Sequence, residues 1–527
     1  MPRQPEIPSL GRPLRTPIFR NLLVADVVSD IGAFMQSTGA AWLMVSLNAG
    51  PMYVALTQTA SALPFFVFAL PAGAIGDIVD RRKLILFTET WMVCVALVLA
   101  VLTIAGLIAP LSLLILTFAL SAGDAFETPT WRAVLPEVVS KEDLAAASAL
   151  NGIEFNFARA IGPGLAGLAI AAAGVGSAFL LNAVSFAGVL FVIARWKRVV
   201  HKRTSPPETL MGATVAAVRY VHYSPAIRTL LARSGLVMFF ASGLLALLPL
   251  LARIVRNSPT AYGLLLGCFG FGAVLGALLM QRARAHWSSE AVVAGGVAIF
   301  GVSTIAASTL RSLPALSALM IIAGAGWIVF LSLMNVLVLN HTPDWVRARV
   351  LAVSTLVFQG AVAAGSAIWG AVASRLGVGT ALLYAGAGTT AMTALALFLR
   401  LPDATVDLTS WNHWRLPVVK YSTETPDDDF GPVLVTVEYQ VAPEHVEEFL
   451  KAVRQYRRIR RRDGARRWGI FHDMENGHRY IETFIVASWA EHLRQHERFT
   501  KADLQTEEQV QRCLMSEPKV QHLVSVE

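Results

Sequence analysis

Long stretches of this chain carry no charged residue, and they predict where it crosses a membrane. Residues 31–76 are uncharged throughout. That run is too long for one spanning helix and suits two, because a bilayer core of about 30 Å takes roughly 20 apolar residues per helix. The sequence Asn48-Ala-Gly-Pro51 is typical of a turn and separates the two helices. Similar runs continue to residue 399 and predict twelve spans, at 20–47, 53–76, 84–106, 109–127, 147–172, 176–195, 226–251, 260–281, 290–310, 313–340, 347–373 and 377–399.

The spans fall into two groups of six, which we interpret as a repeat. After a cytoplasmic segment at 1–19, we expect one six-helix half at 20–195, a basic cytoplasmic linker at 196–225 and a second half at 226–399. Within the linker, residues 213–223 predict a short helix on the membrane surface. Paired six-helix halves are an architecture in which substrate binds near the bilayer midplane and the halves rock around it.

Polar composition returns at residue 400 and marks a soluble part of the chain. We expect a linker at 400–430 and a cytoplasmic domain at 431–527. Alternating apolar residues predict strands near 433–441, 465–473, 478–487 and 520–526, with helices after Pro443 and after the capping sequence Ser488-Trp-Ala-Glu491. This order of strands and helices is ferredoxin-like. The predicted fold class is an all-α polytopic membrane protein of twelve transmembrane helices with a C-terminal ferredoxin-like α+β domain.

The positive charge of the chain follows its predicted topology. The net charge is +8, yet only 15% of the residues are charged and 55% are hydrophobic, whereas about 25% of the residues in a soluble domain are charged. Arginines and lysines gather before the first span and after the second, sixth, eighth and tenth. This bias predicts that both termini lie in the cytoplasm. Topology accounts for the basic excess, so we expect no nucleic-acid binding.

Ionisable residues inside the predicted spans are the first candidates for function. Asp26 and Asp30 lie one helical turn apart in the first span, and charged groups at membrane depth are costly and usually functional. Asp30 is the deeper of the two and could exchange a proton; the alternative is a hydrogen bond to a neighbouring helix. Glu154 and Arg159 in the fifth span are further candidates for proton coupling or substrate binding, or each pairs with another helix. Three other carboxylates are expected nearer the cytoplasmic ends of their spans: Glu89, Asp124 and Glu127.

The junction after the second span holds a charged cluster that we interpret as a conformational latch. Its members are Gly73, Asp77, Asp80, Arg81 and Arg82. Asp77 stands at a helix end, where its charge can face Arg81 or Arg82 in one conformation of a rocking carrier and lose that partner in the other. The plainer interpretation is a loop that its basic residues hold in the cytoplasm.

A Gly-Pro-x-x-x-Gly stretch in the fifth span favours close contact between helices. Gly162, Pro163 and Gly167 together permit a near approach and a local bend. Small residues are also common wherever membrane helices pack, so packing without a special role is the alternative.

The soluble tail offers two features with competing interpretations. His492 and His496 are four residues apart on a predicted helix, but Leu493 stands where a zinc protease needs Glu, so we expect a packing or solvated role, with no metal and no cofactor. Eight arginines lie within residues 454–467. They either end a helix favourably or contact anionic membrane lipids, and the sequence leaves both open.

These motifs together resemble the enterobactin-exporter-like and macrolide-efflux-like branch of the major facilitator superfamily of transporters. The match rests on Asp80-Arg81-Arg82, on Gly123-Asp124-Ala-Phe-Glu127, on Arg159-Ala-Ile-Gly162-Pro163, and on a tail similar to that of the transmembrane secretion effectors. Ile78 departs from the pattern, because the superfamily loop commonly carries Arg there. The resemblance implies efflux of a small amphipathic molecule such as a siderophore or a macrolide, and the Gly162 motif resembles that of export-type antiporters.

The expected energy source is an ion gradient, because the sequence has no Gly-rich phosphate-binding loop for ATP. The partners we expect are therefore a small-molecule substrate, protons and membrane lipids. The tail also resembles small dimeric monooxygenase-like α+β domains. That resemblance implies a dimer through the C-terminal domain and, as an alternative to a transporter without enzymatic activity, an enzyme fused to a transporter.

Overall fold

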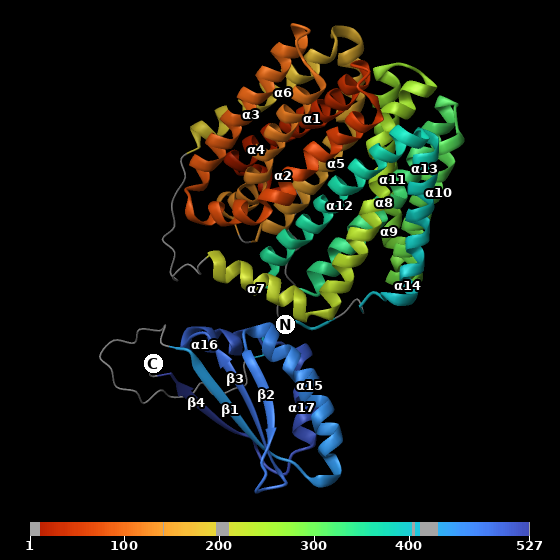
Figure 1. Cartoon of the computed structure of the whole chain (residues 1–527). Coiled ribbons are helices and arrows are strands. Elements are labelled where there is room, and N and C mark those ends of the chain that lie inside the picture. The colour runs from red at the N-terminus through yellow and green to blue at the C-terminus, as the bar shows by residue number, and fades with distance from the viewer. Residues whose placement is uncertain (1–10, 141, 197–209, 403–405, 412–430, 526–527) are drawn as a thin grey trace, which may run out of the picture. The chain divides into compact units, whose positions relative to one another are not determined.

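The computed structural model describes residues 11–140, 142–196, 210–402, 406–411 and 431–525, most of them helical (Figure 1). A short turn η1 (Arg12–Arg15) precedes the first six long helices, α1 (Pro17–Ser46), α2 (Gly50–Ile78), α3 (Arg81–Ile104), α4 (Pro110–Val138), α5 (Leu144–Ala173) and α6 (Val175–Arg195). The next helices are α7 (Leu210–Tyr223), α8 (Pro225–Val255), α9 (Pro259–His286), α10 (Ser289–Thr309), α11 (Leu313–Asn340), α12 (Arg347–Leu376), α13 (Val378–Ala391) and α14 (Leu395–Phe398), with the turn η2 (Met392–Ala394) between the last two.

Eleven helical segments of the described residues are long and apolar enough to cross a membrane, judged by length and composition. They are α2 to α6, α8 to α12 and the segment Val378–Phe398. Helix α1 has 30 residues but is not among the eleven, in keeping with the polar Asp26, Asp30 and Gln36 along it. The chain is therefore a mainly helical protein built to pass the membrane many times.

Prolines and the carboxylate of Asp80 set several of the helix starts. Pro17, Pro110 and Pro259 are the first residues of their helices, where the missing N–H group costs no helical hydrogen bond. Asp80 caps α3 by accepting a hydrogen bond from the backbone N–H of Lys83 at 3.0 Å. These local signals explain why one charge-free run divides into two helices.

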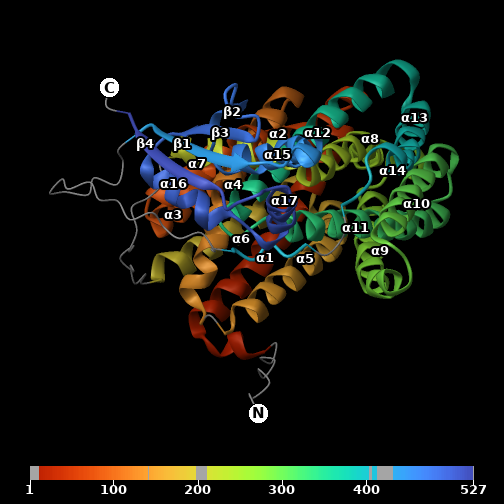
Figure 2. The same cartoon turned by 90° about the horizontal axis from the view of Figure 1, so that it is seen from below.

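The described C-terminal residues form a four-stranded antiparallel sheet. Its strands are β1 (Val433–Gln440), β2 (Arg466–His472), β3 (Arg479–Val486) and β4 (Lys519–Val524), in the order β2-β3-β1-β4. A turn η3 (Pro443–His445) leads into α15 (Val446–Asp463), and α16 (Trp489–Arg498) and α17 (Lys501–Arg512) follow β3. Helices α15 and α17 lie side by side (Figure 1, Figure 2).

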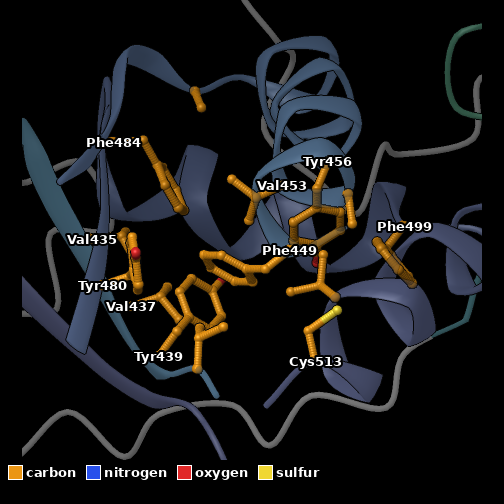
Figure 3. Packing of buried hydrophobic residues seen from close by; sticks show 14 of the residues in the cluster. Val435, Val437, Tyr439, Phe449, Val453, Tyr456, Tyr480, Phe484, Phe499 and Cys513 are labelled. Atoms are coloured by element: carbon orange, nitrogen blue, oxygen red, sulfur yellow. The ribbon is translucent and has the colours of Figure 1, made fainter. Parts of the chain in front are cut away.

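Alternation along β1 builds the core of this soluble part. Val435, Val437 and Tyr439 are at most 3% exposed. Figure 3 shows Phe449 and Val453 of α15 facing these strand residues. All four predicted strands are confirmed within two residues of their expected ends.

The helix predicted after residue 488 is confirmed at its start. The hydroxyl of Ser488 accepts a hydrogen bond from the N–H of Glu491 at 3.3 Å, as the capping sequence predicts. The helix then ends at Arg498, and α17 begins anew after Thr500. There the carboxylate of Asp503 accepts hydrogen bonds from the Thr500 N–H at 2.9 Å and from its hydroxyl at 2.7 Å, a second cap that separates the two helices.

The chain divides into two compact units. One comprises residues 1–205, 231–335 and 354–401, and the other comprises 206–230, 336–353 and 402–527. The second unit therefore contains α7 and the ends of α8, α11 and α12 in addition to the sheet and its helices.

Candidate transport site

A cavity of about 200 Å³ lies among the helices of the first unit. Helices α1, α2 and α5 line it from the first half, and α8 and α9 from the second. Aromatic and polar side chains share its wall, among them Phe34, Tyr262 and Phe269 with Ser37, Gln58, Ser61 and Arg159. A hollow with apolar walls and a few polar groups is typical of a small-molecule site.

Glycines bring helices together beside the cavity. A Cβ atom added to Gly263 of α9 would lie 2.5 Å from the carbonyl oxygen of Pro163 in α5. One added to Gly167 would lie 3.0 Å from a carbonyl oxygen of α9, and one on Gly162 would lie 2.6 Å from the Cβ atom of Phe34 in α1. The Gly-Pro motif therefore lies at helix crossings, whereas its role in export stays a prediction.

Arg159 lines the cavity from the middle of α5. Its guanidinium carbon lies 5.9 Å from the centroid of the Phe269 ring in α9, which is a cation–π contact across the two halves. Among the residues that the structure describes, no carboxylate forms an ion pair with it.

Asp30 of α1 and Glu154 of α5 meet within hydrogen-bonding range. Two carboxyl groups share a hydrogen bond only when one of them carries a proton. Asp26, one turn before Asp30, accepts a hydrogen bond from the indole N–H of Trp131 at 3.1 Å. Glu154 is thus the partner of Asp30, whereas Arg159 lines the cavity.

A second carboxyl pair lies near this one; both of its residues were named from the sequence, but not as a pair. Glu89 of α3 and Glu127 of α4 are 2% and 9% exposed, and they lie within hydrogen-bonding range of each other. The hydroxyl of Thr88 also donates to Glu127 at 2.6 Å. The signal in the sequence was their position inside predicted spans, but only the packing of α3 on α4 joins them.

The cluster after the second span contacts α4 and α6. Arg81 donates to the carboxylate of Glu137 and to a carbonyl oxygen of α4, both at 2.7 Å. Arg82 donates to two carbonyl oxygens at the end of α6, at 3.2 and 2.7 Å. Gly73 lies in the C-terminal part of α2, and the side chain of Asp77 lies outside the described part of the structure. The latch therefore stays a prediction.

Within the described residues, hydrogen bonds from Arg253 and Thr59 join the two halves. Arg253 of α8 donates to the carbonyl oxygen of Val45 at 3.0 Å and to Oδ1 of Asn48 at 2.5 Å. In the first half of α2, the hydroxyl of Thr59 donates to the carbonyl oxygen of Ala363 in α12 at 2.9 Å.

In the second unit, α7 packs on the soluble domain through Arg219. Its guanidinium donates to the carboxylate of Glu491 at 3.0 Å and to the carbonyl oxygen of Arg462 at 3.1 Å. Arg498 donates to the same carboxylate at 2.7 Å. Burial alone would raise the pKa of Glu491, but its bonds to Arg498 and Arg219 outweigh burial and lower it.

Aromatic residues extend this contact to the α11–α12 turn. The hydroxyl of Tyr220 in α7 donates to the carbonyl oxygen of His341 at 3.1 Å, and its ring meets that of Trp345 edge-on. Arg498 of the soluble domain lies 4.6 Å from the centroid of the Trp345 ring, and Arg462 lies 5.7 Å from that of Tyr220. Burial raises the pKa of Tyr220 to about 12.

The two histidines of α16 pack against rings. The ring nitrogens Nε2 of His492 and His496 lie 3.2 Å apart, and His522 of β4 packs on His492 with ring centroids 4.7 Å apart. Burial, with help from the two neighbouring histidines, lowers the pKa of His492 to about 3. Among the described residues, no group of three or more His, Cys, Asp or Glu side chains is arranged to hold a metal ion.

Arginines of the 454–467 run take part in the packing of the domain. Arg462 binds the carboxylates of Asp463 and Asp503 at 2.8 Å each. Arg460 lies over the Phe484 ring at 4.9 Å and 3.5 Å from the carboxylate of Glu482. These arginines serve the fold, and lipid contact by the others stays a prediction.

Two groups of long apolar helices around a shared cavity define a multi-pass membrane transporter. The chain belongs to the transmembrane secretion effector family of the major facilitator superfamily, whose model matches residues 9–527. The resemblance drawn from the sequence is thereby confirmed.

Curated relatives are transporters of the same kind. The chain is 24% identical over 392 residues to the multidrug efflux pump Tap of Mycolicibacterium fortuitum, covering 72% of this chain and 94% of that protein. It is 21% identical over 372 residues to the staphyloferrin A transporter of Staphylococcus aureus, covering 70% and 93%. It is 25% identical over 266 residues to the enterobactin exporter of Salmonella typhi, covering 50% and 63%.

Solved structures share the fold. A bacterial homolog of the human lysosomal transporter Spinster, inward-facing and unoccupied, matches with a TM-score of 0.57 at 13% identity, over 74% of this chain and 96% of that one. The nucleoside transporter NupG matches with a TM-score of 0.62 at 10% identity, over 73% and 100%.

Proposed function

We propose that this protein exports small amphipathic molecules across the bacterial inner membrane in exchange for protons. The observation that carries the proposal is the pair of carboxyl groups, Asp30 and Glu154, beside a cavity shared by the two halves. Phe34 and Arg159 line the cavity. Asp30 lies one helical turn from Phe34, and Glu154 lies five residues from Arg159. Proton and substrate sites next to each other allow one to influence the other.

The coupling requires a carboxyl group that meets each side of the membrane in turn. In the outward-facing state, the Asp30–Glu154 pair takes a proton from the periplasm as substrate leaves. In the inward-facing state, it releases that proton to the cytoplasm as the next substrate binds. One proton then enters the cell for each exchange, and its gradient drives the substrate outward.

The topology we propose has twelve spans, with α1 as the first. Both termini then lie in the cytoplasm, and the α1–α2 turn lies in the periplasm. The contacts of Arg253 and Thr59 close the halves toward that side, which supports an inward-facing state. We propose that the cluster at Asp77 and Arg81 is the latch of the opposite state, so that Asp77→Asn slows transport and leaves membrane insertion near normal.

The relatives support a substrate range from drug-like molecules to siderophores, because a multidrug pump, a staphyloferrin A transporter and an enterobactin exporter are among them. We propose domain limits at 1–19, 20–195, 196–225, 226–399, 400–430 and 431–527. The strand order β2-β3-β1-β4 supports a ferredoxin-like last domain, and we propose that it forms dimers.

The test is uphill efflux from cells that lack the native transporter. Ethidium, a macrolide and a siderophore serve as probes, with and without an uncoupler. We expect Asp30→Asn to abolish uphill efflux and the uncoupler to do the same to the wild type. Asp344→Asn, which neutralises an exposed carboxylate outside the spans, is the matched control and should pump normally.

Normal uphill pumping by the Asp30→Asn chain would place the coupling site elsewhere, with Glu154 next. The alternative of an enzyme fused to a transporter has its own test. Absorption spectra of the purified chain with added haem or flavin, followed by a turnover screen, would detect a catalytic soluble domain.

A further inference from the structure

Arg159 differs in its partners from two other arginines of the first compact unit, Arg233 and Arg81. Arg233 of α8 is 2% exposed, and its guanidinium donates to the carboxylate of Glu290 at 2.6 Å and to the carbonyl oxygen of Leu399 at 3.0 Å. Arg81 likewise binds Glu137. In the described part of the chain, Arg159 has the Phe269 ring and no carboxylate.

A guanidinium has five N–H donors and stays charged at any physiological pH. At membrane depth such a charge is costly unless something compensates it. An aromatic ring compensates for that cost only in part. The donors of Arg159 therefore suit an anion that enters the cavity.

The rest of the wall indicates what carries that anion. Phe34 and Tyr262 offer aromatic surface, and Tyr262 is held by stacking on Trp42 with ring centroids 6.3 Å apart. The hydroxyl of Ser37 donates to a carbonyl oxygen of its own helix at 3.0 Å. The proton of that hydroxyl is therefore engaged within the helix, and Arg159 supplies the only positive charge among the lining residues of this cavity.

We propose that Arg159 binds an oxyanion of the exported molecule, so that the substrate class is organic acids, carboxylates above all, with an aromatic or apolar body. This inference rests on the proposed export function and specifies its substrate. A carboxylate accepts two parallel hydrogen bonds from a guanidinium, which fixes the ligand as well as holding it. The aromatic wall then receives the body.

The test uses two probes with the same ring and nearly the same shape, 2-naphthoate and 2-naphthamide, of which only the first carries a negative charge and two acceptor oxygens. Binding to the purified full-length chain is followed by tryptophan fluorescence, since Trp42 stacks on the cavity residue Tyr262. We expect the wild type to bind the carboxylate at least tenfold more tightly than the amide. Arg159→Gln should remove that preference, and Arg159→Lys should keep part of it because the charge remains.

Arg256→Gln is the matched control, because it removes one exposed positive charge just beyond the end of α8 and should leave the preference unchanged. Thermal unfolding of each variant shows whether it folds. If Arg159→Gln fails to fold, Phe269→Leu takes its place, and we expect a weaker preference once the supporting ring is lost.

Equal binding of both probes by the wild type, or no saturable binding of the carboxylate, would overturn the proposal. So would a preference that survives in folded Arg159→Gln. Binding needs no gradient, so this failure is distinct from failure of export. Anion-selective binding without uphill efflux would refute proton-driven export but not the anion site at Arg159. Uphill efflux without anion-selective binding would refute only the anion site.

Discussion

Arg253 offers a direct test of how the two halves close. Its guanidinium, at the end of α8, holds the α1–α2 turn of the other half through Val45 and Asn48. If the halves separate at this end in the outward-facing state, both hydrogen bonds are lost there. Removing them therefore weakens one state of the carrier and leaves the other unchanged.

The expected size follows from the two bonds. Hydrogen bonds from a charged donor contribute about 1.5–3 kcal/mol each when shielded. The bond to Val45 is partly buried, whereas the bond to Asn48 is exposed and contributes little. We expect losing both bonds to cost the closed state about 2–3 kcal/mol. That cost shifts the ratio of outward-facing to inward-facing protein by roughly 30- to 150-fold.

The assay is labelling of a cavity cysteine from outside the cell. Ser61 lines the cavity, so Ser61→Cys is introduced after Cys94, Cys268 and Cys513 are replaced by alanine. A membrane-impermeant maleimide then reacts in proportion to the outward-open population. We expect Arg253→Gln to raise the labelling rate, up to roughly 30- to 150-fold. Asn48→Gly keeps the bond from Arg253 to the carbonyl oxygen of Val45 and should raise the rate only slightly.

Arg256→Gln is again the control, since it removes the same charge three residues further along the chain. A labelling rate for Arg253→Gln that stays at the wild-type value would refute the idea that these bonds hold the halves together. A similar rise in the labelling rate of both variants would show that the effect comes from net charge and not from these hydrogen bonds.

Three further predictions concern stability. Gly263→Val should destabilise the transporter unit by about 1–3 kcal/mol or more, because the new side chain meets the carbonyl of Pro163; Gly295→Val, where a Cβ meets nothing within 4 Å, is the control in thermal unfolding. Glu482→Ala should destabilise the soluble domain by about 3–5 kcal/mol, measured by proteolysis, since it strands the charge of Arg460, and Glu482→Gln should cost less. His492 has a folded pKa of about 3 against a usual value of 6.5, so only the unfolded chain takes up its proton between those values. The stability contribution is present above pH 6.5 and lost as pH falls, by about 1.4 kcal/mol between pH 7.5 and 5.5; denaturant unfolding that does not change with pH in this range would contradict it.

Patterns that depend on neighbouring residues were readable from the sequence. Charge-free length predicted the spans, because every membrane helix must meet the same apolar thickness. Alternation over 433–441 predicted β1, because one face of a strand is buried while the other is not. The family also followed, since its motifs are local.

Contacts between residues far apart in the chain could not be predicted from the sequence. Glu89 and Glu127 each lie inside a predicted span, but only the packing of α3 on α4 turns them toward each other. For Arg159, a partner on another helix was one of two interpretations, but the sequence did not indicate that this partner is an aromatic ring more than a hundred positions away. Such partners depend on helix rotation and crossing, which a pattern along one chain does not record.

The contacts of Arg219, Tyr220 and Trp345 have a consequence for where the soluble domain ends. Its polar cluster at Glu491 and Arg498 is completed by residues that precede it in the chain by more than a hundred positions. A protein cut after residue 400 would keep Tyr220 and Trp345 but lose the arginines that cover them, and the released tail would lose Arg219. The tail is therefore not a detachable module, and grafting it to another transporter would require the linker helix and the α11–α12 turn to travel with it.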